Sequence, residues 1–541
     1  MCFVANTNSQ DNSRAHQVVT QPDVALRSTQ RFSYDDQGET SPREECGVFG
    51  VWAPGEDVSK LTYYGLYALQ HRGQEAAGIA VGNGGQIVVF KDLGLVSQVF
   101  DEQSLDSLKG HVAIGHTRYS TAGGASWDNA QPMFRMSPDG TDVALGHNGN
   151  LVNHIQLTDE AAELGLVDPK AHPSDSDVMC ALLAHSTTDE HPLEEAAIEL
   201  FPRVNGAFCV TFTDGQNLFA VRDPKGIRPL SLGQLENGGW VVASETCALD
   251  IVGAQFIRDV EPGEMVIINE DGVRSRVFAE AERKSCVFEY VYLARPDAVI
   301  KGQSVHAARV EIGRRLALES PADGDMVIPV PDSGTPAAVG FAQGSGLPFS
   351  QGLVKNAYVG RTFIQPSQTI RQLGIRLKLN PLRQVIEGKR LVVVDDSIVR
   401  GNTQRALVKM LRDAGAAEVH VRIASPPVKW PCFYGIDFAS PEELIANTVE
   451  QDDPVARICE EIGADSLAYV STEAMVAASE QPYNELCAAC FDGKYPLGMP
   501  EGNPNTELVR YMQAQQSCET ADPLEQFVQD AEDVESVTSE Q

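Results

Sequence analysis

The stretch KRLVVVDDSIVRGNTQRALVKMLRDAGAAEVHVRIAS, residues 389–425, decides the fold of the second half of the chain. It begins with a continuous apolar run, LVVV, which is typical of a parallel strand covered on both faces. A short loop follows, and the next residues predict a helix that Asn402 or Thr403 caps and Gly415 ends. Strand, loop, helix and strand in this order indicate an α/β unit with a right-handed crossover.

Two adjacent carboxylates, Asp395 and Asp396, end the first strand of this unit, and the loop 397–402 leads into the helix. Backbone N–H groups at a helix N-terminus form an anion site, and Gly401 allows close approach of the backbone to a phosphate. The hydroxyl of Thr403 can add a donor. Because two acids would repel a phosphate, we expect their partners to be ribose hydroxyls or Mg²⁺. The alternative is an exposed acidic turn.

The composition excludes several function classes. The chain has 541 residues, with 42 Lys and Arg against 75 Asp and Glu and a net charge of −33. We therefore expect no nucleic-acid partner and no binding to anionic membranes, since both need a basic face. No apolar run approaches the length of about 18 residues that a membrane helix needs, and the N-terminus lacks the apolar core of a secretory signal. We expect a cytoplasmic protein.

One internal window has the opposite charge. Residues 333–386 contain no Asp or Glu, and they carry six basic residues, among them Lys355 and Arg361. Such a window predicts focused attraction for a polyanionic substrate. The irregular polar segment 355–381 inside it is typical of a lid that closes over the substrate and excludes water. A basic surface loop is the alternative.

The texture of the chain divides it into four parts. Residues 1–45 are polar and predict a disordered leader. In 46–275, short β-rich runs alternate with Gly, Asn and Asp turns, which predicts an antiparallel-sheet domain with helices. Residues 276–500 form the α/β domain. Residues 501–541 are expected to be a disordered acidic tail, because 519–541 has eight acids and no Lys or Arg.

Cys46 is the first residue of the expected folded region. If the leader is removed in front of it, the same residue carries a thiol and a free α-amino group. That amine, with a pKa of about 7.7–8.0, is a general base placed beside the nucleophile. The alternative is a small apolar residue that starts a strand.

Five motifs then carry a family resemblance: EECGVFGVW (44–52), YYGLYALQHRGQEAAGIA (63–80), GHTRYSTAG (115–123), GHNGNLVN (146–153) and SDSDV (174–178). In this order they resemble the glutaminase domain of class II glutamine amidotransferases. The resemblance implies an N-terminal-nucleophile hydrolase αββα sandwich in which Cys46 attacks the glutamine amide. It also implies an oxyanion hole from Asn148 and the Gly149 N–H, a grip on the substrate α-carboxylate by Arg118, and recognition of its α-ammonium by Asp175.

The string VVVDDSIVRGNT (392–403) resembles the phosphoribosyl-diphosphate (PRPP) signature of type I phosphoribosyltransferases, an α/β fold. The resemblance implies that Asp395 and Asp396 hold the ribose diol and its Mg²⁺. PVPDSGTPAA (329–338) resembles the loop at the diphosphate, with Ser333 beside the metal. The remaining residues that we expect to bind PRPP are Ser397, Arg400, Gly401, Asn402 and Thr403 in the loop and Lys355 and Arg361 in the lid.

Four further cysteines form a candidate metal site: Cys286, Cys432, Cys487 and Cys490. Their softness permits a Cys₄ zinc as well as an iron–sulfur centre. They resemble the ligands of the [4Fe–4S] cluster in one branch of the amidophosphoribosyltransferase family. Members of that branch are made with a cleaved leader. We expect a structural clamp that is sensitive to oxygen. The other cysteines are expected in the core or the tail: Cys2, Cys180, Cys209, Cys247, Cys459 and Cys518.

A glutaminase followed by a PRPP loop makes residues 46 to about 495 similar to the amidophosphoribosyltransferase family. The resemblance implies that ammonia from glutamine passes through a channel to PRPP and displaces pyrophosphate, giving 5-phosphoribosylamine in the first step of purine synthesis. It also implies a homotetramer and feedback inhibition by purine nucleotides. A different class of protein, a PRPP- or nucleotide-sensing regulator, is the alternative. It would be expected to have lost Cys46, Asn148 or the lid, and all three are present.

Overall fold

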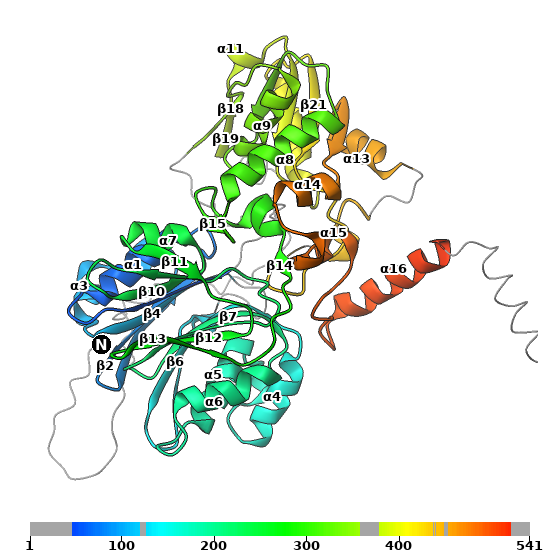
Figure 1. Ribbon diagram of the computed structural model, residues 1–541. Coiled ribbons are helices and arrows are strands. Elements are labelled where there is room, and N and C mark those ends of the chain that lie inside the picture. The colour runs from blue at the N-terminus through cyan, green and yellow to red at the C-terminus, as the bar shows by residue number, and fades with distance from the viewer. Residues whose placement is uncertain are drawn as a thin grey trace, which may run out of the picture.

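The computed structural model describes residues 46–119, 126–356, 378–436, 438, 440–447 and 453–520, with the side chains of 514–520 left out. Two domains follow one another along the chain, the first in blue to green and the second in green to orange in Figure 1. The expected leader (1–45), much of the lid and the end of the tail lie outside the described residues.

The first domain contains two antiparallel sheets. The seven-stranded sheet has the order β11-β9-β10-β1-β4-β2-β3, and the six-stranded sheet has the order β13-β12-β8-β7-β6-β5. The strands of the first sheet are β1 (Gly47–Trp52), β2 (Ala76–Asn83), β3 (Gln86–Leu93), β4 (Val112–Arg118), β9 (Ser231–Gln234), β10 (Trp240–Ala243) and β11 (Gln255–Asp259). Those of the second are β5 (Met133–Met136), β6 (Asp142–Leu151), β7 (Gly206–Thr213), β8 (Leu218–Arg222), β12 (Glu264–Asn269) and β13 (Gly272–Val277).

The two sheets stack face to face, with helices on both outer faces. Val48, Ile114 and Leu218 are among the residues that fill the space between the sheets. The first sheet is covered by α1 (Val58–Ala68), α2 (Val96–Val99), α3 (Glu102–Ser107) and α7 (Thr246–Ile251). The second is covered by α4 (His154–Glu163), α5 (Asp175–Ser186) and α6 (Leu193–Leu200). The predicted αββα sandwich is confirmed (Figure 1).

The second domain is built on a parallel sheet with the order β17-β20-β21-β22. Successive residues of β20 point to opposite faces: Val392 and Val394 pack on the helix pair α8 and α9, and Val393 packs on α12 and α13. Burial on both faces explains the continuous apolar run and confirms the predicted α/β fold. The elements are α8 (Val305–Glu319), β17 (Met326–Pro329), α9 (Thr335–Ser345), β20 (Arg390–Asp395), α12 (Asn402–Asp413), β21 (Glu418–Ile423), α13 (Pro454–Ile462) and β22 (Ser466–Tyr469).

Short elements complete this domain and its junction with the first. They are β14 (Ser285–Cys286), β15 (Val299–Ile300), β16 (Gln303–Ser304), β18 (Leu353–Lys355), β19 (Leu379–Pro381), α11 (Arg383–Ile386), α14 (Thr472–Ala478), β23 (Leu486–Cys487) and α15 (Ala489–Asp492). β14 pairs in parallel with β23, so the start of the second domain and its C-terminal end are joined. β13 ends at Val277, two residues beyond the boundary expected at 275.

Two sequence expectations are wrong. Neither Asn402 nor Thr403 caps α12: Gly401 precedes its first residue with a φ of +75°, and no side chain caps the helix. A disordered tail was expected from residue 501, but the residues Pro504–Thr520 form the helix α16. Val509 and Thr506 are buried, and Val509 belongs to the core cluster of the second domain, so tertiary packing stabilises a segment whose own composition is polar.

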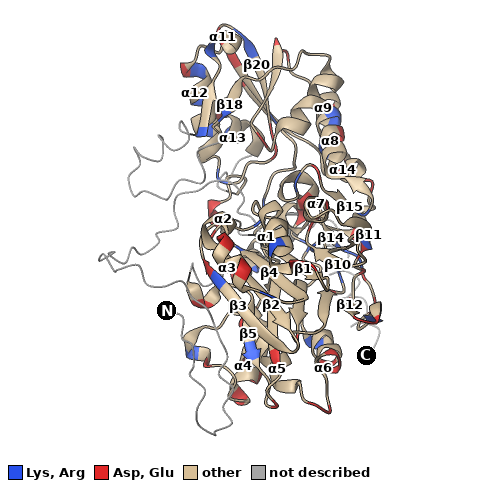
Figure 2. Ribbon diagram, turned by 90° about the vertical axis from the view of Figure 1, so that its left-hand side faces the viewer, with Lys and Arg blue, Asp and Glu red and all other residues tan. Residues whose placement is uncertain are grey.

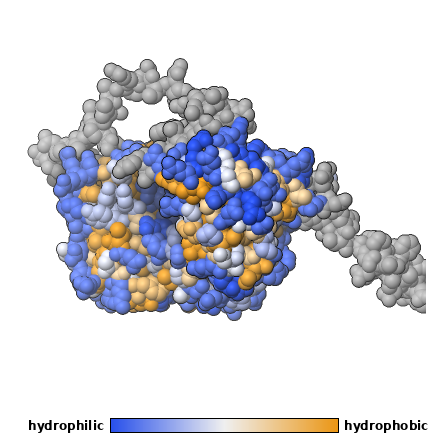
Figure 3. All heavy atoms as spheres, turned by 90° about the horizontal axis from the view of Figure 1, so that it is seen from above, coloured by the Kyte–Doolittle hydropathy of each residue, from blue (hydrophilic) through white to orange (hydrophobic). Residues whose placement is uncertain are grey.

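The surface is mixed in character. Basic and acidic segments are interspersed along both domains in Figure 2, and the face seen in Figure 3 carries hydrophobic patches beside hydrophilic areas. No described helix combines the length and the apolar character needed to cross a membrane. Cys180, Cys209 and Cys247 are buried as expected, and Cys459 is half-buried, whereas the side chains of Cys2 and Cys518 lie outside the description.

Candidate active sites and a cysteine-lined cavity

Cys46 lies immediately before β1, at the same end of the sheet as the last residue of β4. Gly47 pairs with Thr117, which places Cys46 next to Arg118. The Cys46 Sγ donates a weak hydrogen bond to the Tyr119 carbonyl at 3.5 Å. Burial raises the pKa of the Cys46 thiol above its ordinary value. The positive charge of Arg118 opposes this increase, and the negative charge of Asp175 adds to it. Both expected glutamine-binding residues, Arg118 and Asp175, therefore lie within electrostatic reach of the Cys46 thiol.

Asn148 and Gly149 lie on β6, in the second sheet. The Asn148 side chain is fully buried, and neither its amide oxygen nor its amide nitrogen has a hydrogen-bond partner among the described residues. A buried amide without a partner is costly, so its donor and acceptor are free to bind a ligand. Gly149 has a φ of +147°, and a Cβ there would lie 1.9 Å from the Ala207 carbonyl oxygen. Only glycine fits that position.

Asp175 begins α5 and faces the end of β6. Its carboxylate accepts hydrogen bonds from the backbone N–H of Ser176 (2.7 Å) and of Leu151 (3.3 Å) and lies 3.6 Å from His147 Nδ1. Burial by itself would raise the pKa of Asp175, but His147 and the Ser176 N–H outweigh it and hold the pKa well below its usual range. A carboxylate that stays ionised suits recognition of an ammonium group.

Sequence reasoning did not single out Arg72, which follows α1 in the second resemblance motif. Its guanidinium is 1% exposed, and its Nε donates to the Cys46 carbonyl at 3.2 Å. Nη1 binds Glu245 at 2.6 Å and Nη2 binds Glu289 at 2.8 Å. The motif QHRGQE, residues 70–75, contains Arg72 and could have pointed to it. Its two glutamate partners lie far away in the sequence, so their pairing with Arg72 could not be predicted.

The predicted PRPP acids lie at the carboxyl end of β20. Asp395 and Asp396 are each 6% exposed. Burial and the neighbouring Asp396 raise the pKa of Asp395 well above its usual range; burial likewise raises the pKa of Asp396, although a hydrogen bond from Ser333 opposes it. The structure thus brings Ser333 to Asp396, as expected. Gln404 donates to Asp395.

The expected phosphate loop runs from Ser397 into α12. The Ser397 hydroxyl donates to Asp396 at 2.6 Å, and Arg400 forms an ion pair with Glu443 at 3.0 Å. At Gly401, with its positive φ, a Cβ would lie 2.4 Å from Ile445 Cδ1. Asn402 accepts a hydrogen bond from Arg405, which lies three residues further along α12. Thr403 occupies the first turn of the same helix.

Of the lid, only its two ends are described. Lys355, at the end of β18, forms a 2.6 Å ion pair with Asp332, the neighbour of Ser333. The structure therefore brings this lysine to the expected diphosphate loop. Arg361 and the rest of the segment 357–377 lie outside the described residues.

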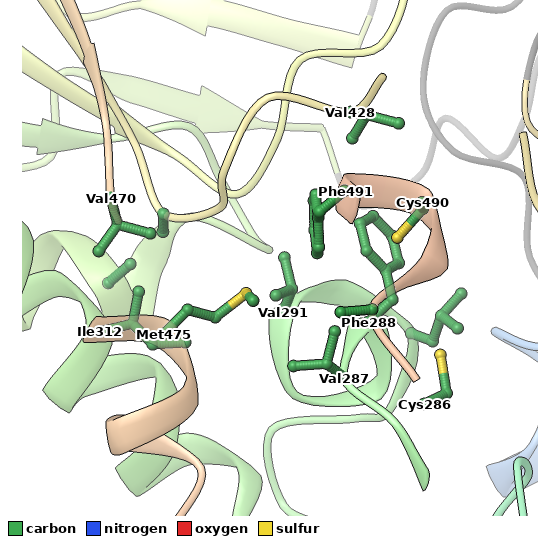
Figure 4. Packing of buried hydrophobic residues seen from close by; sticks show 14 of the residues in the cluster. Cys286, Val287, Phe288, Val291, Ile312, Val428, Val470, Met475, Cys490 and Phe491 are labelled. Atoms are coloured by element: carbon green, nitrogen blue, oxygen red, sulfur yellow. The ribbon is translucent and has the colours of Figure 1, made fainter. Parts of the chain in front are cut away.

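All four predicted metal-site cysteines line one cavity. Cys286 and Cys487 are direct partners in the β14–β23 pairing, Cys490 lies in α15, and Cys432 approaches from the loop after β21. Figure 4 shows Cys286 and Cys490 at the edge of the apolar packing around Phe288. Burial raises the pKa of the Cys286 and Cys487 thiols to about 12, and Arg228, also in the cavity wall, opposes it.

The arrangement of these thiols bears on which metal they suit. Within the described ranges, no three His, Cys, Asp or Glu side chains are placed to hold one metal ion. The four thiols nevertheless surround a common space. In a Cys₄ zinc site all ligands converge on one ion, whereas a [4Fe–4S] cluster distributes four cysteines over four irons.

Comparisons with known proteins match both halves of the chain. A family described as the glutamine amidotransferase domain matches residues 116–250. The amidophosphoribosyltransferase of Mycobacterium tuberculosis is 68% identical over 486 residues, which is 89% of this chain and 92% of the relative. The Bacillus subtilis protein of the same name is 47% identical, over 84% of this chain and 94% of the relative.

Solved structures agree. The glutamine phosphoribosylpyrophosphate amidotransferase of B. subtilis, complexed with ADP and GMP, superimposes with a TM-score of 0.78 at 44% identity, over 86% of this chain and all of that chain. A structure described as the allosteric regulatory enzyme of purine biosynthesis matches with a TM-score of 0.79 at 45% identity, over 86% and 99% of the two chains.

Proposed function

The chain belongs to the amidophosphoribosyltransferase family, and from that premise we propose which of its residues carry out each half of the reaction. It is an enzyme that transfers ammonia from glutamine to PRPP, giving 5-phosphoribosylamine, glutamate and pyrophosphate, the first step of purine biosynthesis. The regulator that lacks chemistry finds no support among these relatives. The reaction has two steps: hydrolysis of the glutamine amide and substitution at the ribose.

In the first step, the Cys46 thiol attacks the side-chain amide carbon of glutamine. The thiol proton passes to the α-amino group of Cys46, which exists only once the leader 1–45 is removed, and the protonated amine then gives a proton to the departing ammonia. Arg118 binds the α-carboxylate of glutamine and Asp175 binds its α-ammonium. Water then hydrolyses the thioester, with the same amine as base, and releases glutamate.

The observation that carries this assignment is the buried Asn148 amide without a partner among the described residues. As the carbonyl oxygen of glutamine becomes an oxyanion, the Asn148 nitrogen can donate to it together with the Gly149 N–H. A preorganised donor of this kind stabilises the tetrahedral intermediate because it needs no reorganisation during the reaction.

In the second step, ammonia replaces pyrophosphate at C1 of the ribose. Asp395 and Asp396 accept hydrogen bonds from the ribose hydroxyls, while the loop from Ser397 to Thr403 presents backbone donors, with Arg400, Gly401 and Asn402, to the 5′-phosphate. Lys355 and Arg361 are assigned to the diphosphate. We propose that ammonia crosses inside the protein, since most of it would be protonated in neutral water.

The PRPP acids also suit Mg²⁺. Two neighbouring buried carboxylates with raised pKa values need a neutralising charge, and carboxylate and hydroxyl oxygens are the ligands that this hard cation prefers. We propose that Asp395, Asp396 and Ser333 hold the ion. When bound, Mg²⁺ supplies positive charge to the diphosphate leaving group.

Enclosure by four thiols suits a [4Fe–4S] cluster held by Cys286, Cys432, Cys487 and Cys490. When bound, the cluster supplies covalent links between the start of the second domain and its C-terminal end. Purine nucleotides as feedback inhibitors, a homotetramer and a cytoplasmic location complete the proposal.

The test is to purify the protein without oxygen, determine its N-terminus and measure pyrophosphate release from PRPP with glutamine or with ammonium. We expect a chain that begins at Cys46, and we expect Cys46→Ala to lose glutamine use and keep ammonia use. Cys180→Ala, a change at another buried thiol of the same domain, serves as control and should keep both. A working enzyme that still carries residues upstream of Cys46 contradicts the proposal.

A further inference from the structure

Four buried charged side chains form a continuous network where the two domains meet. Arg72 binds Glu245 at 2.6 Å and Glu289 at 2.8 Å, and Arg228 approaches Glu289 at 3.6 Å. None of the four side chains is more than 2% exposed. The two arginines and two glutamates balance in charge, and the partly exposed His71 ring also contacts Glu245, at 2.7 Å. Buried ion pairs are not needed for stability, since apolar residues of the same volume often serve as well, so the network calls for another explanation.

Arg72 connects this network to the proposed nucleophile. Its Nε donates to the carbonyl oxygen of Cys46 at 3.2 Å. The position of a residue's carbonyl oxygen relative to its own nitrogen depends on ψ, one of the two soft backbone angles. Arg72 holds the Cys46 carbonyl, and the Tyr119 carbonyl holds the Cys46 thiol at 3.5 Å. Together these contacts limit rotation about the Cα–C bond of Cys46 and set the direction of its α-amino group, which is the proposed base. The separation of the amine and the thiol within Cys46 depends on its χ1 angle, whereas ψ decides whether both groups face the bound glutamine.

Glu289 is the member of the network that comes from the second domain. It begins a π-helical turn, Glu289–Leu293, just after β14. Arg309 of α8 holds this turn from the other side: its Nε donates to the Tyr290 carbonyl and its Nη2 to the Ala294 carbonyl, both at 2.7 Å. The Glu289 carboxylate is thus presented to Arg72 from a firmly held backbone.

Arg228 lies beside the same carboxylate, at 3.6 Å, on the side of the cysteine-lined cavity. Its Nη2 donates to the Tyr434 carbonyl at 2.9 Å, and the Tyr434 N–H donates to the Cys432 Sγ at 3.3 Å. Contacts therefore run from Cys432 through Tyr434 and Arg228 to Glu289, and from there through Arg72 to Cys46.

We propose that Glu289 is a positioning residue for the glutaminase reaction: the second domain, through Glu289 and Arg72, sets the backbone of Cys46 so that its amine and thiol face the glutamine amide. The inference rests on the proposed role of Cys46. It predicts that the chemistry at Cys46, but neither glutamine binding nor chemistry at the PRPP site, depends on the Glu289 charge.

The test compares Glu289→Gln with Glu264→Gln in purified enzyme shown by mass spectrometry to begin at Cys46. Glu264 is a matched control, because it is a buried glutamate paired with an arginine, Arg258, and not with Arg72. For Glu289→Gln we expect kcat with glutamine to fall about 10-fold or more, with KM for glutamine within about 2-fold and ammonia-dependent kcat unchanged. Glu264→Gln should leave all three values unchanged.

Two further measurements separate positioning from a merely structural role. The pH profile of Cys46 alkylation by iodoacetamide should shift in Glu289→Gln and not in the control, and Glu289→Asp should recover part of the lost kcat. If Glu289→Gln does not fold, Arg72→Lys, which keeps the charge and loses the Nε donor, should show the same selective loss.

Equal losses with glutamine and ammonia, or an unchanged kcat with glutamine, overturn the inference. Cys46→Ala is assayed alongside. If that variant keeps glutamine use, the proposed role of Cys46 has failed. If it loses glutamine use while Glu289→Gln does not, only the positioning role has failed.

Discussion

Cys286 and Cys487 lie directly opposite each other in the two-stranded parallel pairing of β14 with β23. The first residue lies at the entrance to the second domain and the other near its end, so the pairing closes almost the whole domain into one loop. The Val287 N–H donates to the Cys487 carbonyl at 3.1 Å and continues the ladder past the thiols. A group that bonded both sulfurs would lock this closure.

Replacing Cys286 with serine should remove the metal centre and destabilise the second domain. A hydroxyl is a poor ligand for iron, and metal binding free energy is folding free energy when the ligands come from distant segments. Anaerobically purified wild type should contain about four irons per chain with visible absorbance, and Cys286→Ser should lose both and melt at a lower temperature.

Cys459→Ser is the matched control for this prediction, because Cys459 is half-buried in α13 and does not line the cavity. It should retain iron, colour and melting temperature. Elemental analysis that finds one zinc and no iron in the wild type contradicts the cluster assignment.

Asn148→Ala should lower glutamine-dependent turnover by about 10²–10³-fold, the range measured for single oxyanion donors. The reason is that the side-chain amide binds the intermediate more strongly than the substrate, so kcat falls and KM does not rise. Steady-state rates with glutamine and with ammonium check this, and the ammonium rate should not change. Asn217→Ala, at a turn where Asn217 bonds Asp214, should have no effect on either rate. A rise in KM at constant kcat would assign Asn148 to substrate binding instead.

Gly149→Ala and Gly146→Ala form a matched pair on one strand. A Cβ at Gly149 meets the Ala207 carbonyl oxygen at 1.9 Å, whereas at Gly146 the nearest atom, Thr211 Oγ1, is 3.4 Å away. The first substitution also forces an L side chain into a positive φ, so it should cost at least about 2 kcal/mol and abolish glutamine use. The second should be close to wild type in urea denaturation and in activity. Equal behaviour of the two variants contradicts the described strand geometry.

Much of the fold could be predicted because the deciding signals are local. The apolar run of β20 requires cover on both faces, and the motif order around Cys46, Arg118, Asn148 and Asp175 belongs to one family of sites. The helix α16 could not be predicted, since it depends on Val509 entering a core formed by residues from other parts of the chain. Propensity is a weak prior where tertiary packing decides.

The same distinction separates the site residues that were predicted from those that were missed. Gly401 was expected to approach a phosphate. The structure shows in addition that it precedes α12 with a positive φ and without a side-chain cap, and that a Cβ at this position would clash with Ile445. Arg72 was missed because its role is defined by Glu245 and Glu289, which no spacing in the sequence relates to it. Pairings between distant segments become visible only in three dimensions.

Asp395→Asn should abolish product formation with both nitrogen donors. The substitution keeps the shape and removes the charge that we assign to the ribose and Mg²⁺, so the loss should be about 10²-fold or more. Pyrophosphate release with glutamine and with ammonium measures it. Asp325→Asn is the control, because Asp325 lies at the opposite end of the same sheet, where it binds Arg390. A variant that loses only glutamine use would place Asp395 outside the PRPP site.

Acidification should destabilise the first domain through His116. This side chain is fully buried, and one ring nitrogen lies 2.9 Å from the His147 carbonyl oxygen. Burial lowers the pKa of His116 to about 3, although the His147 carbonyl opposes it. In the unfolded chain the pKa of histidine is about 6.5, so below that pH the unfolded state binds a proton that the folded state excludes. Stability is therefore fully present above pH 6.5 and falls as the pH drops toward 3.

The measurement is urea denaturation of the wild type and of His116→Gln at pH 7 and pH 5. His116 should account for about 2 kcal/mol of the stability that the wild type loses between these values, so the loss should be smaller by that amount in the variant. The variant itself is expected to be less stable at pH 7, because its amide has to be buried, and only the difference between the two pH values decides. His306→Gln, at an exposed position of α8, should retain the wild-type difference. If both variants show the wild-type difference, His116 is already protonated in the folded protein at pH 5, and its burial is compensated by a partner other than the His147 carbonyl.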